Sequence, residues 1–361
     1  MISYFIPLIL LAILAFLENL NKSILKIKNK YLYSFVFFFF IFFVGLRYSI
    51  GCDWDSYEYN FNIIRLKDLS YILKNQDQFF DLGYSILAKL ISYKFDNNML
   101  IFVYAILFTM PLFYFCANIK RTYLSLMISY PYFIVVVGMG PIRQAAAIAF
   151  LMLTFVFIEK RKNNFIYFSS FLSMLFHQSA IIINLLIISK FTSFLKKKRK
   201  KLFSYLFYFF VTLIVLYNSP IIFNKLYIYI SLSGFNGINP AKGVFLVWLI
   251  NFLPSIVFLL NYSKFNFQIS LKVFLKTTSF LIIGIFPILF INSVVSYRLI
   301  LYFLPFSIYI TSYIPEIELF KIKPTTIFYC LTLLSFLSLF IWLKYAYHAY
   351  CWLPYQNILF F

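Results

Sequence analysis

Long apolar runs separated by short basic clusters recur along the chain and restrict the folds open to it. Most of the runs are roughly 16 to 20 residues long, close to the length that an α-helix needs to cross the hydrocarbon core of a bilayer. Of the 361 residues, 63% are hydrophobic and 12% are charged, whereas about 25% of the residues of a soluble protein are charged. These features exclude a water-soluble globule and predict an all-α, polytopic integral membrane protein.

The apolar segments predict about 12 transmembrane helices in one membrane domain over residues 1–361. The segments are Ile2–Leu17, Tyr31–Leu46, Met99–Ala117, Thr122–Val137, Ile142–Ile158, Phe165–Phe176, Ala180–Ser189, Leu202–Tyr217, Val244–Leu260, Thr277–Val294, Leu299–Tyr313 and Thr326–Leu343. The first lacks a preceding basic region and a small-residue cleavage site, so we interpret it as a retained helix. A shorter run, Leu82–Tyr93, contains Lys89 and predicts an interfacial helix.

Basic residues give the chain a formal net charge of +21. The densest cluster, Lys196–Lys201, directly precedes the apolar run Leu202–Tyr217, as is typical of topogenic residues that face anionic lipid. We therefore expect no nucleic-acid partner. Placing the Asn21–Lys30 linker in the cytoplasm puts most Lys and Arg residues on that side, and this orientation leaves both termini outside.

The segment Phe165–Ser189 is flanked by basic clusters at both ends, which disfavours a single span. Two arms of about 12 residues would each reach about 18 Å, against a hydrocarbon core of about 30 Å. We predict a short helical hairpin whose tip, His177-Gln178-Ser179, lies below the external surface in a cavity of the protein. Two longer external loops are expected at Arg47–Asp96 and Asn218–Gly243.

Three arginines and one histidine are expected at the external ends of helices: Arg47, Arg143, Arg298 and His177. Guanidinium groups bind phosphate and diphosphate in a bidentate manner, and a helix starting at Pro141 would add a favourable N-terminus beside Arg143. His177 could accept a proton from a hydroxyl nucleophile. The alternatives are interfacial snorkelling for the arginines and simple packing for His177.

The segment Asp53-Trp54-Asp55-Ser56-Tyr57 lies in the first expected external loop. Its two carboxylates could hold a divalent cation on a diphosphate, but aromatic side chains beside acids also suit a sugar, and we favour sugar contacts over a metal site. None of the four cysteines forms a CxxC motif, so we expect no zinc site. Cys52 and Cys351 both fall in expected external segments, where a disulfide is possible.

Four short motifs occur in the order of the signatures of the EpsG-like, Wzy-type polysaccharide polymerases, and the chain resembles this family. They are Gly45-Leu46-Arg47-Tyr48 with Gly51, Asp53 and Tyr57; Arg143-Gln144 with His177-x-Ser179-Ala180; Ser296-Tyr297-Arg298 with Tyr302; and Trp352-Leu353-Pro354-Tyr355. Cys52 and Asp55 match no position of this pattern, so the resemblance lends no support to a metal ligand at Asp55.

The resemblance implies a GT-C-like glycosyltransferase of the bacterial inner (cytoplasmic) membrane whose active site faces the periplasm or outside. Such an enzyme transfers a glycan from undecaprenyl diphosphate onto the non-reducing end of a new lipid-linked repeat unit, without a metal or cofactor. Its substrates would be undecaprenyl-diphosphate-linked oligosaccharides as donor and acceptor. A chain-length regulator and a flippase are the further partners that the resemblance suggests.

Combining the residue chemistry with the resemblance gives a set of candidate site residues. The catalytic candidates are His177, Arg143 and Arg298, with the two arginines on the diphosphate and His177 on the acceptor hydroxyl or, as a hydrogen-bond donor, on the phosphate. The substrate-binding candidates are Arg47, Asp53, Tyr57, Tyr302, Gln144, Trp352 and Tyr355.

Three other functions use some of the same features. An O-antigen ligase would need the same arginines and base, and only the order of the motifs favours a polymerase. A flippase or other transporter for lipid-linked oligosaccharides predicts internal repeats and charges near the membrane midplane, whereas the candidate cations collect at one face. A membrane O-acyltransferase would take its acyl donor from the cytoplasm, away from His177.

Overall fold

The computed structural model describes residues 1–20, 30–75, 80–181, 183–184, 243–317 and 322–360. Within these ranges the chain is helical and contains no β-strand, in agreement with the predicted all-α class. The main helices are α1 (Ile2–Leu20), α2 (Lys30–Gly45), α3 (Trp54–Leu66), α4 (Leu69–Lys74), α5 (Leu82–Ser92), α6 (Asn97–Ala117), α7 (Thr122–Ser129), α8 (Ile142–Glu159), α9 (Asn163–Phe176), α13 (Val244–Leu260), α14 (Ile269–Gly284), α15 (Phe286–Ile291), α16 (Ser293–Ile300), α17 (Leu304–Tyr313) and α18 (Pro324–Tyr345).

Six helical segments of the described chain are long and apolar enough to cross a membrane. They are Ile2–Leu20, Asn97–Ala117, Ile142–Glu159, Leu271–Phe290, Ser293–Glu316 and Pro324–Tyr345, and five shorter apolar helices accompany them. The protein is therefore a multi-pass membrane protein, and the predicted count of about 12 spans is not confirmed. The predicted segment Leu202–Tyr217, most of Ala180–Ser189 and nearly all of the loop Asn218–Gly243 lie outside the described residues.

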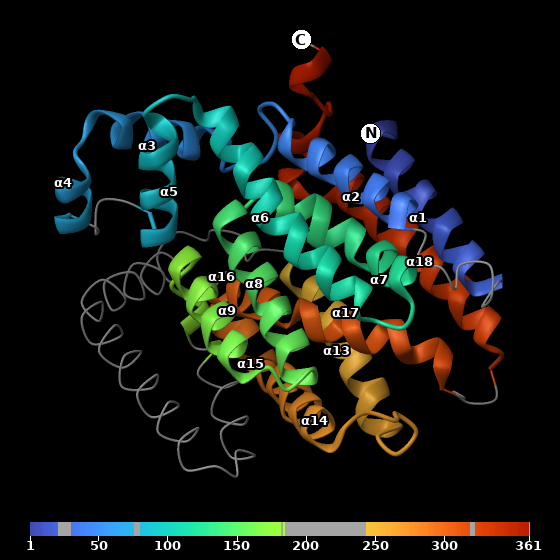
Figure 1. The fold of residues 1–361 in the computed structure, drawn as a ribbon. Coiled ribbons are helices and arrows are strands. Elements are labelled where there is room, and N and C mark those ends of the chain that lie inside the picture. Colours follow the sequence, from blue (N-terminus) through green and yellow to red (C-terminus); the bar gives the residue numbers. More distant parts are fainter. Residues whose placement is uncertain (21–29, 76–79, 182, 185–242, 318–321, 361) are drawn as a thin grey trace, which may run out of the picture.

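Helix α8 occupies the centre of the bundle, packed between α6 and α9 (Figure 1). Its first turns contain Ala145, Ala146 and Ala147, all fully buried. Small side chains let neighbouring helices approach closely where no hydrophobic effect drives helices together. The start of α8, which carries Arg143, is thereby held among several neighbouring helices.

The bounds of one predicted segment were wrong. The segment Thr277–Val294 is divided among α14, α15 and α16. The helix restarts at Phe286-Pro287, and Asn292 caps α16 by accepting a hydrogen bond from the Val295 amide at 3.0 Å. Residues 47–96, which were predicted to form the first external loop, contain three helices, α3 to α5, which project together from one side of the bundle (Figure 1).

The predicted hairpin tip is a helix break in the structure. Helix α9 ends at Phe176, His177 is extended (φ −157°, ψ 121°) and helical structure resumes at Ala180. The Asn184 amide reaches back to Ser173 Oγ at 3.2 Å, and Ser173 in turn donates to the carbonyl of Ala147 in α8 at 2.8 Å. The first arm is thus tied both to the start of the second arm and to α8. Residues beyond Asn184, which would complete the second arm, lie outside the described residues.

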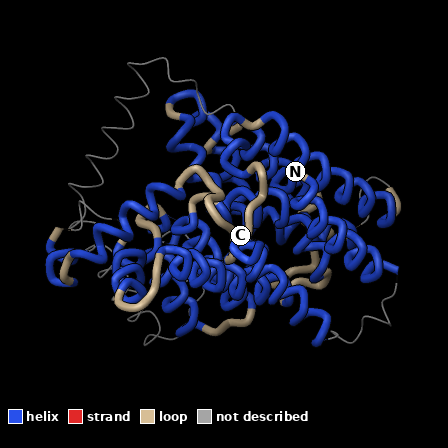
Figure 2. The backbone as a smooth tube through the Cα atoms, turned by 90° about the horizontal axis from the view of Figure 1, so that it is seen from above, coloured by secondary structure: helices blue, strands red, loops and turns tan. Residues whose placement is uncertain are grey.

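The C-terminal segment folds back onto the turn that follows α2. Tyr48 donates its amide to Gln356 at 3.1 Å, and Ile358 donates to Leu46 at 2.8 Å. An isolated antiparallel bridge joins Arg47 and Asn357. Both termini lie on the same side of the molecule, as Figure 1 shows, and the loops gather around the C-terminus when the molecule is viewed from above (Figure 2).

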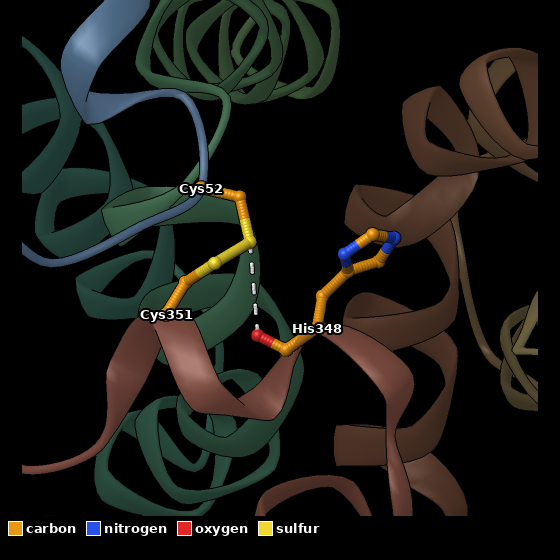
Figure 3. Close-up of a disulfide and its surroundings, with 3 residues drawn as sticks. All are labelled: Cys52, His348 and Cys351. Atoms are coloured by element: carbon orange, nitrogen blue, oxygen red, sulfur yellow. Dashed lines mark hydrogen bonds between the residues drawn. A yellow bond between two sulfur atoms is a disulfide. The ribbon is translucent and has the colours of Figure 1, made fainter.

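A disulfide between Cys52 and Cys351 strengthens this junction (Figure 3). The two Cα atoms are 5.2 Å apart although 299 residues separate the cysteines in sequence. The pairing that the sequence left open is therefore present in the structure. The imidazole of His348 points away from the disulfide, and only its carbonyl oxygen approaches Cys52 Sγ, at 3.7 Å.

Candidate active site

A tight contact between two turns determines where Arg143 lies. The π-helix η3 (Tyr130–Val137) precedes α8, and the turn Gly138–Pro141 connects them. Gly51 packs directly on this turn: a Cβ at Gly51 would lie 2.3 Å from the carbonyl oxygen of Met139, and its φ of +99° also favours glycine. The first motif is thus fitted against the start of α8, where Arg143 is the second residue.

Arg143 forms an ion pair with Asp81 through Nη1 and Oδ2. Its guanidinium carbon lies 3.9 Å from the centre of the Phe80 ring, close enough for a cation–π contact. Asp81 is 7% exposed, and its Oδ1 accepts a hydrogen bond from the backbone amide of Gln178 at 3.0 Å. One carboxylate therefore connects Arg143 to the turn that carries His177.

Nδ1 of His177 and two hydroxyl oxygens form a triangle of polar atoms. Nδ1 is 2.6 Å from Ser179 Oγ and 3.0 Å from the Tyr302 hydroxyl, and the two hydroxyl oxygens are 2.9 Å apart. Tyr302 is fully buried, whereas His177 and Ser179 are partly exposed. Because both nearby hydroxyls engage Nδ1, the orientation of the imidazole is fixed and the proton on Nδ1 determines the role left for Nε2.

Arg298 lies on α16 and is exposed. The side-chain amide of Gln144, buried in α8, donates to the Arg298 carbonyl at 2.8 Å. Tyr302, whose hydroxyl lies 3.0 Å from His177 Nδ1, follows Arg298 by four residues in the chain. Gln144 thus joins α16, which carries Arg298, to α8, which carries Arg143.

Asp53 and Tyr57 occupy the start of α3. Asp53 precedes the helix and is exposed, whereas Tyr57 is 2% exposed. The Tyr57 ring packs against Phe80, and its hydroxyl interacts with Arg143. Burial raises the pKa of Tyr57 to about 12, and the nearby Arg143 acts in the opposite direction. Tyr57 thus forms part of the wall around the guanidinium, with Asp53 at the outer edge.

Arg47 is buried to 1% exposure, the most enclosed of the candidate arginines. Its guanidinium donates to the carbonyls of Val44 at 2.6 Å and Ile50 at 3.5 Å. Burial lowers the pKa of Arg47 to about 10, which still leaves it charged at neutral pH. In this arrangement Arg47 holds the turn after α2. The sugar contact predicted for Arg47 stays a prediction.

Trp352 and Tyr355 are likewise used for packing. The indole of Trp352 donates to the Val135 carbonyl of η3 at 2.9 Å, and its ring is 4% exposed. Tyr355 donates to the Phe43 carbonyl at 2.7 Å and stacks on the Phe43 ring at 4.8 Å between centroids. The terminal motif therefore holds the C-terminal segment against α2 and η3, beside the Gly138–Pro141 turn.

Asp81 was missed by sequence reasoning, and the role of Ser179 beside His177 was not assigned. Asp81 is one of seven acidic residues in the segment 47–96, together with Asp53, Asp55, Glu58, Asp68, Asp77 and Asp96. Its position next to Phe80 and just before an apolar helix is a weak local signal. Ser179 was visible as part of the His177-x-Ser179 motif, but the spacing alone did not indicate a side-chain contact.

The assembled site combines a cation that can bind an anionic leaving group with an imidazole on an adjacent turn. A guanidinium near the membrane surface stabilises a phosphate or diphosphate, and an imidazole can accept or donate a proton. Among the described residues, no three His, Cys, Asp or Glu side chains cluster as metal ligands would. By residue chemistry, the arrangement can serve anion binding and proton transfer.

A comparison of the chain with known protein families agrees with the resemblance that the order of the motifs indicated. A model described as the EpsG family matches residues 30–357, which include every candidate residue from Arg47 to Tyr355. No curated protein and no solved structure matches the chain, so the GT-C-like fold stays a prediction. Because the match covers nearly the whole chain, this multi-pass membrane protein belongs to the EpsG family of Wzy-type polymerases, and a membrane polysaccharide polymerase-like function follows.

Proposed function

We propose that the protein transfers a glycan from undecaprenyl diphosphate onto the non-reducing end of a new lipid-linked repeat unit. The observation that carries the proposal is the connection of Arg143 to the His177 turn through Asp81. The leaving group of this reaction is a lipid diphosphate, which a guanidinium stabilises, and its nucleophile is a sugar hydroxyl, which needs a base. Both requirements are met by adjacent residues.

In the proposed reaction, the bond between the anomeric carbon of the donor glycan and the diphosphate oxygen breaks. Its electron pair leaves with the diphosphate, where Arg143 and Arg298 stabilise the negative charge. The acceptor hydroxyl oxygen forms the new glycosidic bond and gives its proton to His177. No metal or nucleotide sugar takes part in the proposed step.

The tautomer of His177 decides whether the residue acts as a base on the acceptor hydroxyl or as a hydrogen-bond donor to the phosphate. If Nδ1–H donates to Ser179 or Tyr302, Nε2 is an acceptor and can serve as the base. If Nδ1 instead accepts from a hydroxyl, Nε2–H can donate to a phosphate oxygen. We favour the base, because the Arg143 and Arg298 guanidinium groups already supply donors to the diphosphate.

The active site is proposed to face the periplasm or outside in the inner membrane. The basic turn Lys160-Arg161-Lys162 lies at the opposite end of α8 from Arg143, which supports this orientation by the positive-inside rule. The Cys52–Cys351 disulfide near the site also supports it, because disulfides persist in oxidising compartments. A chain-length regulator and a flippase are the partners expected there.

The test compares glycan ladders from a deletion strain complemented with wild type, His177→Ala or Arg143→Ala at matched expression. We expect the wild type to restore a ladder and both variants to yield single repeat units. Normal ladders from a stable Arg143→Ala protein would refute the diphosphate assignment. A deletion strain that keeps its ladder would refute the polymerase assignment. If the deletion strain also lost single-unit capping, a ligase would be favoured. If it instead lost lipid-linked repeat units from the outer surface, a flippase would be favoured.

A further inference from the structure

Asp81 connects two parts of the site that the chain delivers from different helices. One carboxylate oxygen pairs with Arg143 at the start of α8, and the other accepts the Gln178 amide of the turn between α9 and Ala180. Asp81 itself directly precedes α5. The carboxylate therefore sets the spacing between the guanidinium and the turn that carries His177.

Close helix packing holds Asp81 in this position. Helix α5 contacts α9, and a Cβ at Gly83 would lie 2.8 Å from the carbonyl oxygen of Leu175, so only glycine permits this approach without displacement. At the other end of α5, the Lys89 amine donates to the Arg65 carbonyl at 3.2 Å near the end of α3. Helix α5 is thus anchored at both ends.

The ion pair leaves Arg143 with unused capacity. Nε of Arg143 is buried and has no hydrogen-bond partner among the described residues. The guanidinium side chain keeps 22% of its surface exposed, whereas the Asp81 side chain keeps 6%. An incoming anion can therefore reach the exposed part of the Arg143 side chain, where it must share the cation with the carboxylate.

We propose that Asp81 is a positioning residue that holds Arg143 and the His177 turn in register and competes with the donor diphosphate for the Arg143 guanidinium. This inference rests on the proposed function. The proposal predicts that removing the charge of Asp81 strengthens diphosphate binding but slows turnover. Removing the charge of Asp81 frees Arg143 to bind the diphosphate more tightly, and it also loosens the spacing on which the reaction depends.

Asp81→Asn is the informative variant, because the amide oxygen can still accept from Gln178 while the negative charge is lost. We expect undecaprenyl diphosphate to bind about three- to tenfold more tightly, the scale of a charge-assisted contact freed from a competing anion. We expect kcat for a synthetic lipid-linked repeat unit to fall about ten- to 100-fold, since a displacement of roughly 1 Å can cost about 100-fold. KM for the donor should fall as well.

Two further variants test whether the effect of Asp81→Asn depends on Arg143 and is particular to Asp81. In Arg143→Gln, the added Asp81→Asn change should leave undecaprenyl diphosphate binding unaltered, because Asp81 acts through Arg143. Asp68→Asn is the matched control: Asp68 is exposed and precedes α4 in the same external region, with no side-chain cap. This control should keep wild-type binding and turnover.

The binding measurement uses the full-length protein in detergent, with thermal unfolding recorded for each variant. Unchanged binding and unchanged kcat in folded Asp81→Asn would overturn the proposal, as would tighter binding that persists without Arg143. If Asp81→Asn fails to fold, Asp81→Glu replaces it. Because Asp81→Glu retains the charge, donor affinity should stay within about twofold of wild type. Its kcat should fall, since the longer side chain alters the spacing. A kcat equal to that of wild type would contradict the positioning role. If the wild type does not extend the repeat unit, the proposed function fails before Asp81 is judged.

Discussion

Ser179 Oγ lies 2.6 Å from Nδ1 of His177, although the two residues belong to a helix break rather than to a regular turn of helix. The extended backbone at His177 places the hydroxyl of Ser179 beside the imidazole, and the Tyr302 hydroxyl completes the triangle. The two hydroxyl contacts hold the imidazole in one orientation, and the role of Nε2 depends on whether Nδ1 donates or accepts in them.

Removing the Ser179 hydroxyl should therefore impair turnover more than folding. We expect Ser179→Ala to lower kcat about tenfold, because Tyr302 still contacts Nδ1 and only part of the orientation is lost. Ser179→Thr retains a hydroxyl and should recover most of the activity. Single-turnover rates with a lipid-linked acceptor give the measurement, and equal rates in the alanine and threonine variants would contradict an orienting role.

Truncation of Arg298 should separate activity from stability. Its side chain is exposed, so Arg298→Ala should change the free energy of unfolding by only about 0.5 kcal/mol or less. We expect polymerisation to fall about 100-fold or more if the guanidinium stabilises the leaving diphosphate. Arg298→Lys keeps the charge but loses the bidentate geometry and should be intermediate. A ladder of normal length from Arg298→Ala would instead indicate that Arg298 is an interfacial residue.

Loss of the Cys52–Cys351 disulfide should destabilise the protein. Removing a native disulfide typically costs about 2–5 kcal/mol, and this one closes a very long section of chain. Cys52→Ser, Cys351→Ser and the double variant should all lower the unfolding temperature by a similar amount, since any one change breaks the same bond. Thermal unfolding with and without reductant measures the effect. An unfolding temperature of wild type that does not respond to reductant would show that the bond is absent in solution.

Polymerisation should be insensitive to chelation. The proposed step uses Arg143 and Arg298 to balance the charge of the diphosphate, so EDTA added to the purified enzyme should leave the rate within about twofold of the untreated sample. Readdition of Mg²⁺ or Mn²⁺ should have no restoring effect. Loss of activity in EDTA that either ion restores would revive the Asp53–Asp55 pair as a cation site.

The sequence predicted that Arg143 and His177 lie at corresponding helix ends, but it did not predict the contacts that each candidate residue makes. Arg143 and His177 were expected near one another, and the structure connects both to Asp81. Arg47, Trp352 and Tyr355 were predicted to bind substrate, which stays a prediction, and in the structure all three donate side-chain hydrogen bonds to backbone carbonyls. Arginine and aromatic side chains suit ligand binding and packing equally well, and only their surroundings distinguish the two uses.

The sequence by itself determined the membrane class, the helical architecture and the helix break at His177, because apolar length, basic flanks and helix reach are local properties of the chain. Tertiary structure alone decided which acidic residue meets Arg143 and which cysteines pair. Asp81 lies 62 residues from Arg143 and 97 from Gln178, and Cys52 lies 299 residues from Cys351. Contacts over such separations depend on how helices pack, for which a single sequence carries no local signal.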